Sequence, residues 1–94
     1  MDVQIVACMP CYARRRTALR LAKTIEEQLD LDVAVVSGTH GQLDVLVDGE
    51  MLQFAPYLIN EDKHFPALAE FVLNELNKRA HRPEPAPAWQ AVFP

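Results

Sequence analysis

A change in hydrophobic period at residues 8–11 constrains the fold of this chain more than any other feature of its sequence. Residues 3–7 are a short β-branched run typical of a buried strand. From Cys11 to about Leu29, apolar residues recur at steps of four, three and four, which places them on one helix face. Residues 32–36 form a second apolar run. A strand, a helix and a strand in this order predict a parallel, right-handed βαβ unit.

The later part of the chain predicts a hairpin and a second helix. Residues 43–47 and 50–54 are strand-like runs, and the Asp48-Gly49 pair between them is typical of a type I′ turn. Residues 55–64 are expected to form a loop. Pro66 is expected to begin a helix, because a proline in the first helical turn loses no backbone hydrogen bond. The predicted apolar face of this helix comprises Leu68, Val72 and Leu76.

The element order β-α-β-β-β-α predicts an α/β fold of the mixed α+β type, with a four-stranded mixed sheet and two helices. We expect residues 3–7 and 32–36 to be parallel and central in this sheet, with the 43–54 hairpin antiparallel beside them. The chain has 94 residues, enough for one domain, which we assign to residues 1–80. Residues 81–94 are rich in proline and are expected to be an extended, flexible tail.

Composition and charge exclude several classes of function. The formal net charge of −4 argues against a nucleic-acid partner, because phosphate binding needs a basic face. No apolar run approaches the length of a membrane span, and the first residues lack the pattern of a secretory signal. Two cysteines three residues apart do not make the disulfide framework of a secreted protein. We therefore expect a cytoplasmic protein that binds neither nucleic acid nor membrane.

The Cys8-Met9-Pro10-Cys11 motif is the predicted chemical centre of the chain. A Cys-x-x-Cys pair between a strand and a helix of a βαβ unit is a thioredoxin-like redox signature. The unpaired N–H groups at the helix start favour negative charge, so at least one of the two thiols is expected to have a pKa below its ordinary value. A stabilising disulfide is less favoured, because closing so short a loop removes little chain entropy; two inert buried thiols are the other alternative. We assign Cys8 and Cys11 as catalytic residues and Met9 and Pro10 as motif-flanking residues.

Three consecutive arginines, Arg14, Arg15 and Arg16, follow the motif. Taken singly, each is best explained as part of a solvated helix face. Taken together beside a reactive thiol, they are candidates for stabilising a thiolate or for attracting an anionic partner such as glutathione.

Metal binding and protein docking are the alternatives for the same motif. Structural zinc usually has four ligands, and the chain has one cysteine pair, so no metal site is expected. The histidines interpreted as surface residues are His40, His64 and His81. Two thiolates alone could still hold Cu(I), as in a ferredoxin-like copper carrier, which would need a further strand, for which residues 88–93 are the candidate. A non-catalytic protein-binding module could use the motif, and Trp89 and Phe93 in the tail could dock a partner or pack on the domain.

Residues 3–80 resemble the selenoprotein W, T and H group, also called the Rdx family. The matching features are Cys8-x-x-Cys11 after the first strand, the Gly38-Thr39-His40-Gly41 turn, Asp48-Gly49-Glu50 in the hairpin, and Phe65-Pro66 at the start of the last helix. The resemblance implies a thioredoxin-like fold and a role in cell redox homeostasis. In the selenocysteine members selenium occupies the position of Cys11, whereas in thioredoxin the first cysteine attacks. Either Cys8 or Cys11 could therefore be the nucleophile.

The chain departs from the family pattern at several positions. Arg14 and Arg15 stand where bacterial members usually have aromatic or aliphatic residues, and His64 replaces the glycine that commonly precedes Phe-Pro. Residues 55–63 differ from the usual basic stretch, and the proline that precedes the third strand of thioredoxin has no counterpart. The resemblance therefore does not extend to a shared partner surface.

These observations together predict a thiol–disulfide redox protein and candidate oxidoreductase. It would cycle between a Cys8–Cys11 dithiol and disulfide, with protein thiols, protein disulfides or glutathione as partners. No organic cofactor is expected, because the sequence contains no glycine-rich phosphate loop.

Overall fold

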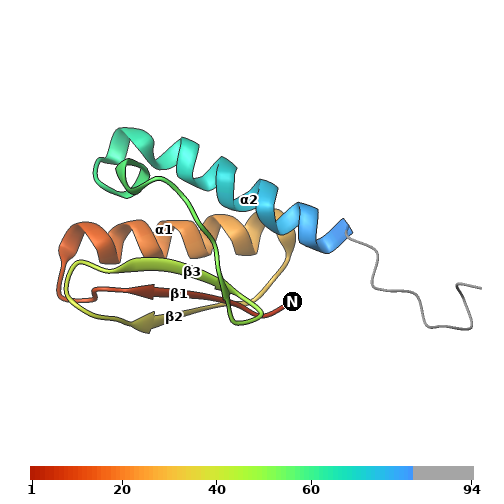
Figure 1. Cartoon of the computed structure of the whole chain (residues 1–94), viewed down its shortest axis with the longest axis horizontal. Helices are drawn as coiled ribbons and strands as arrows, with labels where there is room; N and C mark the ends of the chain where they lie inside the picture. Colours follow the sequence, from red (N-terminus) through yellow and green to blue (C-terminus); the bar gives the residue numbers. More distant parts are fainter. Residues whose placement is uncertain (82–94) are drawn as a thin grey trace, which may run out of the picture.

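The fold has two layers, a four-stranded sheet and a pair of helices that pack on one of its faces (Figure 1). The structure is a computed structural model and describes residues 1–81. In chain order its elements are β1 Val3–Ala7, α1 Tyr12–Leu29, β2 Val33–Ser37, β3 Leu43–Val47, β4 Glu50–Met51, the 3₁₀ helices η1 Pro56–Ile59 and η2 Asp62–His64, and α2 Phe65–His81. The predicted mixed sheet of four strands with two helices is confirmed.

The core lies between the helices and one face of β1 and β3. Both strands bury every second residue, because successive side chains of a strand point to opposite faces. The predicted apolar faces of both helices contribute the other side of the core. The central members are Ile5, Val45, Leu21, Ile25, Leu68, Val72 and Leu76, all with 0 % exposure. Burial of this kind stabilises a domain by about 25 cal/mol per Å² of apolar surface.

The sheet order is β2-β1-β3-β4, so β1 and β3 are the central strands. The expectation that residues 32–36 are central is therefore wrong, although their predicted parallel pairing with β1 is confirmed, with Val33 opposite Val3. β3 pairs antiparallel along the other edge of β1, with Val47 opposite Val3. The physical reason is that β2, which follows α1 in the βαβ unit, occupies one edge of β1. The hairpin buries its alternate residues by pairing along the other edge of β1. β2 is therefore an edge strand of the sheet.

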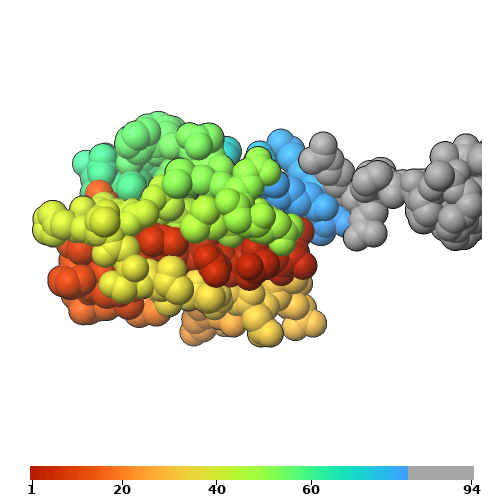
Figure 2. Space-filling view, turned by 60° about the horizontal axis from the view of Figure 1, so that its bottom comes forward, coloured from red at the N-terminus to blue at the C-terminus, as the bar shows by residue number. Residues whose placement is uncertain are grey.

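The sheet face opposite the helices carries half-buried and exposed residues. Its members on the three longer strands are Gln4, Val6, Ala34, Val36, Asp44 and Leu46. Figure 2 shows this side, with β1 in red between β2 in yellow and the hairpin in green.

The hairpin turn is the predicted one, but its second strand is shorter than expected. Asp48 and Gly49 have φ values of 51° and 81°, the two positive values that a type I′ turn needs. β4 ends at Met51, so the prediction of a strand over residues 50–54 is wrong beyond its second residue. Leu52 is only 5 % exposed, because its N–H still donates to the carbonyl of Val45 at 2.8 Å and its side chain joins the core beside that strand.

The segment between the sheet and α2 also differs from expectation. Residues 55–64 contain two short 3₁₀ helices instead of an irregular loop, and Leu58 of η1 is buried. α2 begins at Phe65, one residue before the predicted Pro66, and it includes His81, which the sequence assigned to the tail. The expectations for residues 82–94, including a strand at 88–93 and the roles of Trp89 and Phe93, lie outside the described residues. Across residues 1–81, neither helix combines the length and apolar character that a membrane span requires.

Candidate functional site

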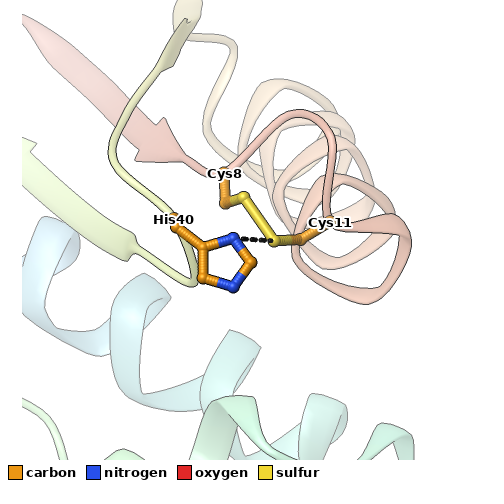
Figure 3. Close-up of side chains that lie close together, drawn as sticks. All are labelled: Cys8, Cys11 and His40. Atoms are coloured by element: carbon orange, nitrogen blue, oxygen red, sulfur yellow. Dashed lines mark hydrogen bonds between the residues drawn. A yellow bond between two sulfur atoms is a disulfide. The ribbon is translucent and has the colours of Figure 1, made fainter.

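Cys8 and Cys11 lie where β1 ends and α1 begins, and they are joined as a disulfide (Figure 3). Their Cα atoms are 5.3 Å apart, within the usual range for protein disulfides. Cys8 follows β1 directly and is 2 % exposed. Cys11 is the N-cap residue of α1 and is half-buried. The two sulfur atoms therefore differ in access, and a partner from solution reaches Cys11 more readily than Cys8.

Backbone hydrogen bonds hold both cysteines in place. The N–H of Cys8 donates to the carbonyl of Gln42 at 2.8 Å, so the loop after β2 fixes the first cysteine. The carbonyl of Cys11 accepts the first helical hydrogen bond, from the N–H of Arg15 at 2.9 Å. Cys11 itself has an extended backbone and makes no side-chain cap. Its side chain therefore stands at the helix end whose first N–H groups have no intrahelical acceptor.

His40 is the residue at this site that sequence reasoning missed. Its Nδ1 atom lies 3.7 Å from Cys11 Sγ, and the ring itself is exposed (Figure 3). The prediction that His40 is a surface histidine is confirmed by its exposure, but the contact of its ring with the motif was not predicted. A signal in the sequence could have found it. β1 and β2 are parallel neighbours, so the loop that follows β2 must lie beside the loop that follows β1.

The loop that carries His40 is built to lie close to β1. The N–H of Gly38 donates to the carbonyl of Ala7 at 2.7 Å, and a Cβ atom at this glycine would meet Val6 Cγ1 at 2.8 Å. The side chain of Gln42 closes the turn, because its Oε1 accepts from the N–H of Thr39 at 2.8 Å. These contacts hold the turn of residues 38–42 against the end of β1.

Arg14 ties the same turn to two other parts of the fold. Its Nε donates to the carbonyl of Gly41 at 3.1 Å, and one terminal nitrogen donates to Asn60 Oδ1 at 3.1 Å. Its other terminal nitrogen donates to the carbonyl of Ile59. Arg14 is half-buried, and its contacts join α1, the His40 turn and the end of η1; the bond to Ile59 is partly shielded from solvent, and the other two are exposed.

Arg15 and Arg16 contact other groups than Arg14. Arg15 donates to the carbonyl of Met9 at 3.2 Å, and its guanidinium lies 5.7 Å from the centre of the Tyr12 ring. Arg16 forms an ion pair with Asp62 at 3.0 Å. None of these contacts, nor those of Arg14, is with a sulfur atom. The proposed stabilisation of a thiolate by the three arginines therefore stays a prediction, and their evident role is structural.

The other histidine with a described side chain lies apart from the motif. His64 Nε2 is 3.9 Å from Glu61 Oε2, and its ring packs edge-on against Tyr57 at 5.2 Å between centres. Within residues 1–81, one group of three potential metal-ligating residues is present. It consists of Cys8, Cys11 and His40, whose ligand atoms all lie within 4.8 Å of one another. The structure therefore places a third potential ligand beside the two cysteines.

The chain matches no known family model, no curated protein and no solved structure. A functional assignment therefore depends on the chemistry of the site, since a fold alone does not imply a function.

Proposed function

We propose that this chain is a thiol–disulfide redox protein whose exchanging groups are Cys8 and Cys11. The observation that carries the proposal is the unequal exposure of two cysteines at disulfide-bonding distance. A half-buried sulfur at a helix start can meet a partner, while a buried sulfur next to it can resolve the product. The proposal includes the thioredoxin-like, Rdx-type relationship and a cytoplasmic location, where thiols are kept reduced.

The proposed exchange begins with the dithiol form. The Cys11 thiolate attacks one sulfur of a partner disulfide, forms a mixed disulfide, and releases the other partner sulfur as a thiolate. The Cys8 thiolate then attacks Cys11 Sγ, which forms the Cys8–Cys11 disulfide and releases the second partner thiolate. Two electrons pass from the dithiol to the partner, and the released thiolates take up the two protons of Cys8 and Cys11. Protein disulfides and glutathione disulfide are the proposed partner classes.

Cys11 is the proposed nucleophile for a steric reason. Displacement requires the attacking sulfur to approach the partner disulfide along its S–S axis, and Cys8 at 2 % exposure offers no such path. Cys11 lies at the helix end, with Tyr12 next to it 66 % exposed, so a partner surface can approach from that side.

Two single-cysteine variants test this proposal by trapping. Cys8→Ser leaves Cys11 able to attack but unable to be resolved, so it is expected to accumulate mixed disulfides with glutathione disulfide or protein disulfides. Cys11→Ser is the matched control, and it is expected to form far less because its remaining thiol is buried. Mass spectrometry of the non-reduced proteins measures both. More adduct on Cys11→Ser would reverse the assignment of the nucleophile.

A redox titration of the wild-type chain tests the function itself. In a series of glutathione mixtures, the Cys8–Cys11 pair is expected to have a midpoint in the range of cellular thiol couples, about −180 to −300 mV. A pair that stays oxidised throughout the series, or that never forms a disulfide, would show that the redox proposal is wrong.

A further inference from the structure

Three side chains at the disulfide are of types that bind metal ions, and their spacing suits a metal site once the disulfide is reduced. Cys8, Cys11 and His40 supply two sulfur atoms and one imidazole nitrogen within 4.8 Å of one another. We propose that the dithiol form binds one soft, thiophilic d¹⁰ ion, Zn²⁺ or Cu⁺, with His40 Nδ1 as the third ligand. Thiolate and imidazole are the donors that these ions prefer, and cysteines separated by two residues are a common ligand pair.

The position of His40 fits this role before any ion is bound. Zn–S and Zn–N bonds of about 2.3 and 2.0–2.1 Å at a tetrahedral angle place the sulfur and nitrogen atoms about 3.6 Å apart. Cys11 Sγ and His40 Nδ1 lie 3.7 Å apart in the structure. The imidazole therefore needs little movement, and it is the sulfur of a reduced Cys8 or Cys11 that must shift when the S–S bond is broken.

The contacts around His40 hold its backbone turn in place independently of the disulfide. The turn of residues 38–42 is bonded to β1 through Gly38, to the backbone of Cys8 through Gln42, and to α1 through Arg14. None of these contacts involves a sulfur atom, so breaking the disulfide leaves them intact. Three ligands complete a trigonal site for Cu⁺, whereas a tetrahedral zinc site would take its fourth ligand, such as water, from outside this group.

Metal binding and disulfide formation would exclude each other at this site. A thiol reductant converts the disulfide to two thiols and becomes a disulfide itself. The ion then binds both thiolates, and the two thiol protons are released to solvent. Because the ion binds only the dithiol form, each tenfold excess of free ion over its dissociation constant raises the midpoint potential of the pair by about 30 mV.

The test uses the full chain, reduced with a phosphine and kept free of oxygen. Competition against a chromophoric chelator measures the affinity for Zn²⁺ and, separately, for Cu⁺. One ion per chain is expected for the reduced protein and none for the disulfide form. His40→Ala is expected to bind at least about 100-fold more weakly, since losing even an outer partner of a ligand costs 10–100-fold. His64→Ala is the matched control, and its affinity is expected to equal that of the wild type.

X-ray absorption of the wild-type zinc complex gives a readout that does not depend on any variant. Two sulfur atoms and one imidazole in the coordination shell are expected. Failure of the reduced chain to bind either ion, or equal affinity in His40→Ala, would overturn the proposal. If the reduced chain binds only Zn²⁺ or only Cu⁺, that result identifies the ion of this site. Redox titration with a chelator present tests disulfide exchange separately, so the two proposals fail independently.

Discussion

The two ends of the sheet are each held by an arginine, but the arginines have different acceptors. At the cysteine end, which comprises residues 8–11 and 38–42, Arg14 donates to the carbonyls of Gly41 and Ile59 and to an amide oxygen. At the hairpin end, which comprises residues 47–50, Arg79 of α2 makes two hydrogen bonds of 3.3 Å to the carboxylate of Glu50.

The difference lies in the charge of the acceptors. The acceptors of Arg14 are neutral groups, so the guanidinium keeps its positive charge close to the motif. Arg79 is paired with a carboxylate that neutralises it, and its side chain is 25 % exposed. The comparison indicates that Arg14 joins three segments at the cysteine end through neutral acceptors, while Arg79 joins α2 to the hairpin through an ion pair with Glu50. Removal of each arginine should therefore have unequal effects.

Arg14→Ala is expected to have the largest effect on stability. It removes one part-buried and two exposed hydrogen bonds, and because water can replace the donor at the exposed acceptors, the free energy of unfolding should fall by about 2–3 kcal/mol. Arg79→Ala should cost no more than about 1 kcal/mol, as surface ion pairs do. Urea unfolding of both variants measures the difference. Arg14→Lys should not restore stability, because an ammonium cannot reach three separated acceptors. Equal losses for the two alanine variants would contradict the comparison.

A pair of glycine substitutions separates close packing from backbone strain. Gly38→Ala places a Cβ atom against Gln42 Oε1, which closes the turn, and 2.8 Å from Val6 Cγ1. It should therefore cost about 2 kcal/mol by overpacking and shift His40 from Cys11. Gly49→Ala meets no atom but has a φ of +81°, so it should cost about 1 kcal/mol. Gly49→Asn should recover most of that loss, because asparagine tolerates a positive φ. NMR shifts of the His40 ring should change in the first variant only.

Reduction of the Cys8–Cys11 disulfide should destabilise the domain only slightly. The loop that it closes spans four residues, for which the entropy of closure corresponds to less than about 2 kcal/mol. Unfolding by urea with and without a phosphine reductant measures this change. A much larger loss would mean that the disulfide holds the cysteine end together, in place of Arg14 and the Gln42 contacts.

The contribution of the hairpin arginine should not depend on pH in the neutral to alkaline range. The hydrogen bond with Glu50 raises the pKa of Arg79 above its ordinary value. A raised pKa contributes stability that is fully present below the ordinary value and is lost only as pH rises through the raised one. The difference in unfolding free energy between the wild type and Arg79→Ala should therefore be the same at about pH 7 and about pH 10. A decline across this range would contradict the assignment.

The sequence by itself determined the elements and the chemical motif. Hydrophobic period is a local property, so the strand at residues 3–7, the helix that ends at Leu29 and the hairpin turn could be read from neighbouring residues. The spacing of Cys8 and Cys11 at a strand–helix junction likewise predicted their closeness, because only two residues separate them where the chain turns from β1 into α1. The early end of β4 escaped prediction, because the pattern of residues 50–54 does not state how far β4 stays paired with β3.

Only the tertiary structure decided the strand order and which residues lie next to the two cysteines. No local pattern states which edge of β1 the hairpin occupies. Because β3 pairs with the free edge of β1, β2 is an edge strand. His40 reaches Cys11 across a separation of 29 residues, and Arg14 reaches Asn60 across 46, instead of reaching a sulfur. Such contacts depend on how the elements pack in three dimensions, because loop position follows from strand pairing and side-chain partners follow from loop position.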